Sequence, residues 1–219
     1  MPDLPPYATV LLLALVGVFL VFALGTNRNV RKGNDLIKWL QGGLPLLGAR
    51  TTLRWLGSTA AIMQIREAKD PFREAEVVVV LKPRDVTFLW AWARAKGRED
   101  FLIFRGRLRG APAFELEAGD RRGWTGMERI GRLDLDTWLE ADWDDPNVKV
   151  VHSRDADPAV ARRAWDQLAA ATQGVWRLSI RRDNPNLEVH LLPPDTAAVP
   201  AERLVEAFRS LAAAIVRRS

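Results

Sequence analysis

The chain has 219 residues, of which 48% are hydrophobic, and it contains no cysteine. The missing cysteines exclude disulfides and thiolate ligands, so a zinc site would have to use the two histidines together with carboxylates. The formal charge of +5 favours an anionic partner such as a lipid surface, and no motif accompanies it that would predict a nucleic-acid partner.

The first predicted element is a membrane anchor that occupies residues 1–27. No charged side chain lies between Asp3 and Arg28, and residues 8–24 read ATVLLLALVGVFLVFAL. At ~1.5 Å per residue, a helix of about 20 residues matches a hydrocarbon core of ~30 Å. A cleaved signal peptide is the alternative, with a passable cleavage site at 23–25, but the segment lacks the basic start of a signal. The anchor residues expected in the bilayer include Val10, Leu13, Val16, Phe19 and Phe22.

The charges that flank the anchor predict its orientation. Arg28, Arg31 and Lys32 follow the apolar segment, whereas no lysine or arginine precedes it. Basic residues close to a membrane-spanning helix favour the cytoplasmic side. We therefore expect a single-pass protein of the cell membrane, with its N-terminus outside and its C-terminal domain in the cytoplasm.

Residues 28–49 are expected to join the anchor to the domain. Within them, residues 34–41 (NDLIKWLQ) predict a short helix, which the Gly-Gly pair at 42–43 ends. Trp39 in this helix suits the bilayer interface. The alternative is a helix that packs on the soluble domain.

The domain is expected to span residues 50–219 and to begin with antiparallel strands. Residues 50–66 are rich in Thr, Leu, Trp and Ile, and Gly57 in their middle predicts one long bent strand or two short ones. Residues 74–82 contain four consecutive valines, typical of a strand covered on both faces. We expect these two segments to pair as antiparallel neighbours.

Two further strands and an irregular segment follow. Residues 101–107 (FLIFRGR) and 113–117 (AFELE) predict strands, and Gly-Ala-Pro at 110–112 supplies the turn between them. Residues 119–147 are the least regular part of the chain and mark a candidate boundary inside the domain. A short helix is expected there near 136–141.

An acidic run occupies this irregular segment. A calcium loop of the EF-hand type needs glycine at its sixth position, where Leu139 stands when Asp134 is counted as the first. We therefore interpret the run as a solvated linker and predict no metal. Its members are Asp134, Asp136, Glu140, Asp142, Asp144 and Asp145.

The last third of the chain has the clearest pattern. A strand is predicted at 148–152, followed by a helix from Asp157 to Gln173. The alternation of 175–181 and 187–192 then predicts a hairpin. The side chains expected to face one side of its first strand are Trp176, Leu178 and Ile180.

A final helix is predicted to open at Pro200 or Ala201 and to end at Arg217 and Arg218. The second half then has the order β-α-β-β-α. The fold class is therefore α+β, with an N-terminal transmembrane helix followed by a mainly antiparallel sheet domain. The apolar face of the final helix consists of Leu204, Val205, Phe208, Leu211, Ala212 and Ile215.

The last third also carries a resemblance. The stretch VKVVHSRDADPAVARRAWDQL, followed by VWRLSIRRDNPNLEVHLLP, resembles the soluble part of uncharacterised single-pass membrane-anchored bacterial and archaeal proteins. It covers about a third of the chain and is a pattern of residue types. The resemblance implies no activity, because those families have no assigned function.

Residues 84–98 (RDVTFLWAWARAKGR) place aromatic side chains beside basic ones. Phe88, Trp90 and Trp92 in this segment are suited to headgroup depth, where arginine and lysine reach phosphates. The segment predicts a second membrane contact or a docking surface for a membrane partner. The alternative is a strand or helix whose aromatic side chains fill the core.

A group of arginines offers a second candidate site. They form either a patch for anionic headgroups or phosphates, or the solvated face of a strand, because they alternate with apolar residues. The members of this candidate anion patch are Arg105, Arg107, Arg109, Arg121 and Arg122.

The two histidines do not predict a catalytic site. His152 precedes Ser153, and neighbouring strand residues point to opposite faces. His190 is expected on the polar side of the hairpin, near Arg177 or Glu188. No phosphate loop, nucleophile elbow or zinc-protease motif is present. We predict no catalytic residue, no cofactor and no identifiable small-molecule substrate.

These patterns favour a non-catalytic function. We expect an accessory, assembly or scaffold subunit whose partners are the lipid bilayer and the other subunits of a membrane complex. The first alternative is a peripheral module that binds anionic lipid or phosphate. The second is an enzyme without a recognisable motif, since many catalytic carboxylates have no local signature.

Overall fold

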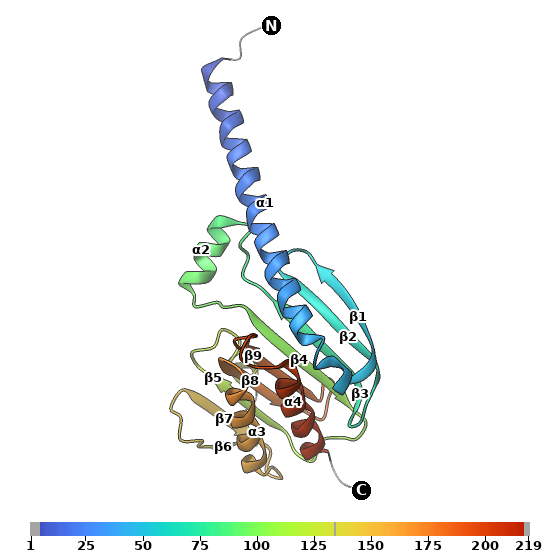
Figure 1. Ribbon diagram of the computed structural model, residues 1–219. Coiled ribbons are helices and arrows are strands. Elements are labelled where there is room, and N and C mark those ends of the chain that lie inside the picture. The colour runs from blue at the N-terminus through green and yellow to red at the C-terminus, as the bar shows by residue number, and fades with distance from the viewer. Residues whose placement is uncertain (1–4, 134, 217–219) are drawn as a thin grey trace.

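The computed structural model describes residues 5–133 and 135–216. It contains one long helix that projects from an α+β domain (Figure 1), which confirms the predicted fold class. Parts of the sequence predictions lie outside the described residues: residues 1–4 of the predicted anchor, Asp134 of the acidic run, and residues 217–219, which include Arg217 and Arg218 at the predicted end of the last helix.

The projecting helix is α1 (Pro6–Leu40), which runs for 35 residues without a break. Its stretch from Tyr7 to Leu40 is long and apolar enough to cross a membrane, and its most apolar part is not buried in the domain. The expected separate helix at 34–41 is wrong, because α1 continues through this segment. Gly33 lies inside this helix, and the ring of Trp55 fills the space that a side chain at Gly33 would occupy.

Within the described residues, nine strands form one antiparallel sheet in the order β1-β2-β3-β4-β9-β8-β5-β7-β6. The predicted pairing of the first strands is confirmed, and Gly57 at φ +70° lies in the turn that divides residues 50–66 into two strands. The strands are β1 (Gly48–Leu56), β2 (Ala60–Ala68), β3 (Phe72–Val80), β4 (Phe101–Leu108), β5 (Leu116–Asp120), β6 (Leu139–Ala141), β7 (Val148–His152), β8 (Gly174–Ile180) and β9 (Leu187–Leu192).

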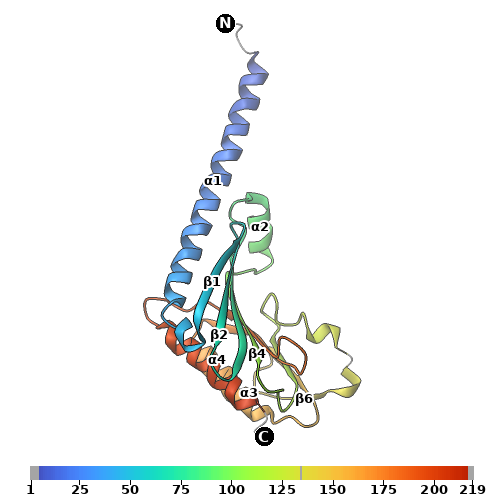
Figure 2. The ribbon, with the colours of Figure 1, turned by 90° about the vertical axis from the view of Figure 1, so that its right-hand side faces the viewer.

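Helices cover one face of this sheet. The helices α3 (Pro158–Ala170) and α4 (Ala201–Ile215) pack there with the C-terminal part of α1, and the segment 121–133 lies on the other side (Figure 2). Phe208 of α4 lies at the centre of this core, 5.3 Å from the ring centroids of both Phe72 and Phe104. The remaining helical elements are α2 (Thr87–Ala95) and the 3-10 turns Leu44–Leu46, Ile130–Arg132 and Leu135–Thr137.

The predicted β-α-β-β-α order of the second half is confirmed as β7-α3-β8-β9-α4. Asp157 caps α3 by accepting a hydrogen bond from the backbone N–H of Ala159. The predicted apolar face of α4 is buried in full: Leu204, Val205, Phe208, Leu211, Ala212 and Ile215.

The predicted turn between 101–107 and 113–117 is wrong. β4 pairs with β9, whereas β5 begins only at Leu116 and pairs with β7 and β8. Pro112 and Ala113 instead contact the end of α4, where the N–H of Ala113 donates to Ile215. The connection is therefore long enough to carry the chain past β9 and β8.

Two smaller predictions also fail. A bulge between Val175 and Arg177 places Trp176 on the face opposite Leu178, with its ring 5.3 Å from that of Phe101. Residues 136–141 do not form a helix. They contain the end of a 3-10 turn and the short strand β6, which pairs with β7.

Candidate functional site

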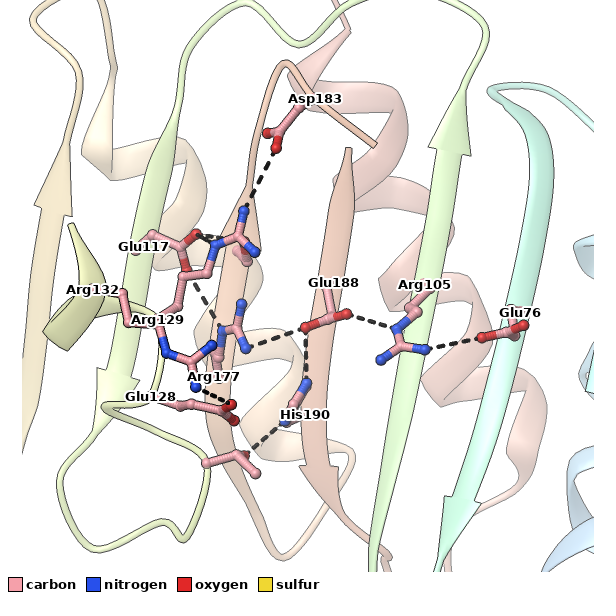
Figure 3. Close-up of polar contacts among 12 residues, drawn as sticks. Glu76, Arg105, Glu117, Glu128, Arg129, Arg132, Arg177, Asp183, Glu188 and His190 are labelled. Carbon is pink, nitrogen blue, oxygen red and sulfur yellow. Dashed lines mark hydrogen bonds and ion pairs between the residues drawn. The ribbon is translucent and has the colours of Figure 1, made fainter. Parts of the chain in front are cut away.

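The face of the sheet that the helices leave free carries a row of polar side chains. Glu76, Arg105, Glu188, Ser179 and Glu117 are successive cross-strand neighbours on β3, β4, β9, β8 and β5. Figure 3 shows most of this row together with the side chains that reach it from a covering loop. We call this row the polar network, together with four side chains that contact it: Arg177, His190, Thr125 and Arg129.

Glu188 is the centre of the polar network. Its carboxylate lies 2.6 Å from Arg105 Nε, 3.2 Å from Arg177 Nη1 and 3.0 Å from His190 Nε2. Burial alone would raise the pKa of Glu188, but its hydrogen bonds with His190 and Arg105 and the positive charge of Arg177 lower this pKa to about 2. The predicted position of His190 beside Arg177 and Glu188 is therefore confirmed.

His190 is held in its neutral form. Burial lowers its pKa, although the hydrogen bond to Glu188 acts in the opposite direction. A neutral ring donates through Nε2 to Glu188 and accepts at Nδ1, which lies 2.7 Å from the hydroxyl of Thr125. At neutral pH the two arginines beside Glu188 are thus the cations that keep this carboxylate ionised.

Glu117 is the other carboxylate of the polar network, and its side chain is 0% exposed. Ser179 donates a hydrogen bond of 2.7 Å to Oε1, while the guanidinium nitrogens of Arg129 and Arg177 stand 3.5 and 3.6 Å away. Burial raises the pKa of Glu117 despite these positive neighbours. Its Oε2 atom has no hydrogen-bond partner among the described residues.

A loop after β5 covers this part of the sheet. A Cβ atom on Gly119 would lie 1.9 Å from the carbonyl oxygen of Gly126, so the loop backbone rests directly on the strand. Thr125 and Arg129 reach from this loop to His190 and Glu117. The loop and the strands therefore depend on one another for the pairing of buried charges.

At its end on β3, β4 and β9, the polar network borders a groove of about 830 Å³ that extends over β2, β3 and β4 on the same face. Glu117, the carboxyl whose pKa is raised, does not line it. Acidic and basic side chains alternate along the groove, which suits recognition of another polar surface. The charged residues that line it are Arg66, Glu67, Arg73, Glu74, Glu76, Arg105, Arg107 and Glu188.

The arginines of the candidate anion patch fall into two groups. Arg105, Arg107 and Arg109 lie on and just after β4, whereas Arg121 and Arg122 follow β5, and β9 and β8 separate the two groups. Carboxylates accompany four of them. The ion pairs join Arg105 to Glu76 and Glu188, Arg107 to Glu74, Arg109 to Asp70, and Arg122 to Asp120 and Asp145.

The aromatic-basic segment 84–98 contains α2, and its aromatic side chains do not fill the core. Phe88 is 72% exposed and Trp92 57%, while Trp90 is half-buried beneath the guanidinium of Arg94. The core-filling alternative is therefore wrong for Phe88 and Trp92. In both ribbon views α2 lies beyond the sheet and alongside α1 (Figures 1 and 2).

An ion-pair cluster missed by sequence reasoning fastens α1 to the segment that leads into α2. Arg84 donates to both oxygens of Asp100 and to Asn29, and Asn29 donates to the carbonyl of Lys82. Lys32 of α1 also reaches Asp100, at 2.5 Å. These hydrogen bonds outweigh the effect of burial and lower the pKa of Asp100. No local sequence pattern predicts the cluster, because Asn29 and Lys32 are far from Arg84 and Asp100 in the sequence.

The other basic residues after the apolar segment are exposed, as is most of the described part of the acidic run. Arg28 and Arg31 are exposed. Trp39 is half-buried and donates from Nε1 to the carbonyl of Val199, so this end of α1 packs on the domain, which was the alternative to an interfacial Trp39. Among the described residues, no three histidine or carboxylate side chains gather as metal ligands would.

Acid is expected to weaken the domain through Glu188 and His190. The pKa of Glu188 falls from 4.5 to about 2 in the folded chain, so its contribution to stability is present above pH 4.5 and is lost as the pH falls through 2. The pKa of His190 is also lowered from 6.5, so its contribution is lost on acidification below that value. Glu117 acts oppositely, because its pKa is raised: its contribution is lost as the pH rises.

Glu188→Gln is therefore expected to remove about 3 kcal/mol of the pH dependence of the unfolding free energy between pH 4.5 and 2. Urea titrations at several pH values, followed by tryptophan fluorescence, measure it. The exposed Glu206→Gln is the control. Parallel pH profiles for the wild type and Glu188→Gln would contradict the role of the carboxylate.

Comparison with models of known protein families finds no match, and comparison with curated proteins finds none with significant similarity.

Proposed function

We propose that this chain is a single-pass accessory or scaffold subunit that docks on a membrane complex and lies against the bilayer. Its N-terminus is outside and its α+β domain is in the cytoplasm. One observation carries the proposal: large apolar side chains are exposed at the end of the domain from which α1 projects. The exposed residues there are Leu56, Phe88, Leu89 and Trp92.

Two separate elements supply these side chains. Phe88, Leu89 and Trp92 belong to α2, and Leu56 ends β1 at the turn to β2. Ser58 in that turn donates to Asp85, so the turn lies beside the segment that leads into α2. An apolar surface beside a membrane helix is energetically favourable only when lipid or another protein covers it.

The attachment of α1 supports a domain that is held in place. A Cβ atom on Gly25 would lie 2.1 Å from the carbonyl oxygen of Arg84, so the helix touches the backbone that leads into α2. Arg84, Asp100 and Asn29 continue this contact. α1 therefore does not behave as a flexible tether, and the position of α2 along the axis of α1 is fixed.

The same contact favours a retained anchor over a cleaved signal peptide. The candidate cleavage site at 23–25 lies inside an unbroken helix, and Gly25 is buried against Arg84. The exposed basic residues Arg28 and Arg31 follow the apolar segment, as the cytoplasmic end of a spanning helix requires.

Spin labels on α2 test the contact with the bilayer. The chain has no cysteine, so Phe88→Cys and Trp92→Cys each provide one labelling site in the full chain in nanodiscs. We expect nitroxides at both positions to be accessible to oxygen and shielded from a water-soluble nickel complex, because they sit in the lipid interface. Gln167→Cys on α3, at the opposite end of the domain, is the exposed control. Equal nickel accessibility at all three positions would contradict the contact.

The docking role requires a separate experiment. The tagged full chain, extracted from its own membrane in mild detergent, is expected to migrate as a complex of defined stoichiometry. Migration of the protein alone would overturn the accessory-subunit proposal, while leaving the lipid contact of α2 to the labelling experiment.

A further inference from the structure

The strand β1 is a free edge of the sheet. Among the described residues β1 pairs with β2 alone, and its outer side has no strand neighbour. The strand is long and its residues are almost all exposed. Every second residue of such an edge directs its N–H and C=O groups outward, which makes the edge a template for another extended chain.

The two faces beside this edge differ in chemistry. Toward the helices, a groove of about 300 Å³ runs between α1 and β1, and Ile37, Leu44, Leu53 and Met63 supply apolar walls. On the opposite face, Arg50 and Arg54 point outward from β1, since they pair with Arg66 and Ile62 on the free face of β2. An added strand would thus meet an apolar groove with one set of side chains and arginines with the other.

The basic face of the edge has few carboxylate partners. Arg50 stands directly opposite Arg66 across the strands. Among the described residues, the ion pair that this position makes is a loose, exposed approach of Arg50 to Glu67 at 3.7 Å. Like charges placed directly opposite each other destabilise a sheet unless an anion joins them. This placement favours an acidic occupant.

A second copy of the chain does not fit this edge. Two copies of β1 in full antiparallel overlap would centre on Thr52 and set Arg50 opposite Arg54 of the other copy twice. Both arginines lie on the same face, so the repulsion would not be relieved. The charges of the edge therefore discriminate against self-pairing.

We propose that β1 accepts an extended segment of a membrane partner, in which acidic and apolar residues alternate. The apolar residues occupy the groove beside α1, and the acidic residues pair with Arg50 and Arg54. This inference specifies the partner segment of the proposed accessory subunit, and it rests on that proposed function. Because β1 ends at Leu56 on the anchor side of the domain, the occupant is a segment close to the membrane (Figure 1).

The test uses the full chain in nanodiscs of neutral lipid and two labelled peptides. In one peptide glutamate and valine alternate, and in the other lysine replaces glutamate. We expect the glutamate peptide to bind and to slow amide hydrogen exchange within 48–56. The double variant Arg50→Glu/Arg54→Glu is expected to bind it about tenfold more weakly and to prefer the lysine peptide. Arg154→Glu/Arg163→Glu, with the same change of charge on exposed residues elsewhere, should bind it as the wild type does.

Three outcomes would overturn the proposal. One is equal binding of both peptides, and another is exchange protection outside β1. The third is a disulfide that links two Thr52→Cys copies without peptide, which would assign the edge to self-association. None of these results affects migration as a complex in detergent, so failure at the edge remains distinguishable from failure of the accessory function.

Discussion

Replacement of Arg177 by methionine is expected to lower the free energy of unfolding by about 3–5 kcal/mol, the usual cost of removing one partner from a buried ion pair. Arg177 is 7% exposed and stands between Glu117 and Glu188. Its loss leaves Glu117 enclosed, with Arg129 as the nearest remaining cation. Urea unfolding of the full chain in detergent, followed by tryptophan fluorescence, measures the change.

Two further variants establish the cause. Arg163→Met removes an exposed arginine from α3 and should change the unfolding free energy by less than about 0.5 kcal/mol. Adding Glu117→Gln to Arg177→Met should recover part of the loss, since the amide carries no charge that needs a partner. A loss in Arg177→Met no larger than in Arg163→Met would contradict the buried network.

Replacement of Gly25 by leucine is expected to separate α1 from the segment that carries α2. A Cβ atom at this position would lie 2.1 Å from the carbonyl oxygen of Arg84, and backbone atoms cannot rotate away as a side chain can. We expect a destabilisation of about 1–3 kcal/mol from this overpacking. Nitroxides on Val21→Cys and Phe88→Cys report the change as a longer, broader distance distribution.

The same helix offers a matched control for this variant. A Cβ atom on Gly17 would have no heavy atom within 4 Å, so Gly17→Leu makes the same substitution without a clash. The distance between the two labels should then stay that of the parent protein. Identical distributions for Gly25→Leu and Gly17→Leu would show that α1 and α2 are not fastened together at this point.

Local patterns predict most of the elements of this fold. Alternation with period two marks β8 and β9, and the apolar spacing of α4 identifies the side chains that become buried. Such patterns depend on near neighbours in the chain. They do not predict which strands pair when the connection is long, and the pairing of β4 with β9 is therefore visible only in the structure.

In the candidate site, too, contacts between near neighbours in the chain are predictable, and contacts between distant segments are not. The position of His190 near Arg177 and Glu188 follows from the register of a single hairpin, so the sequence predicts it. Glu117 lies on a distant strand and Arg129 on the loop that covers it. Judged by residue type alone, both would be expected on the solvated surface. Their burial was not predictable, because it depends on the loop that closes over them.

The apolar N-terminal helix, its basic flank and the α+β domain are predictable from the residues alone, because hydropathy and periodicity act over one element at a time. The exposure of Phe88 and Trp92 on α2 beside α1, and the carboxylate partners of most arginines in the candidate anion patch, become visible only in the folded domain. Exposure and ion pairing depend on which distant segment covers a side chain. That choice is made by packing across the whole domain, and no single segment encodes it.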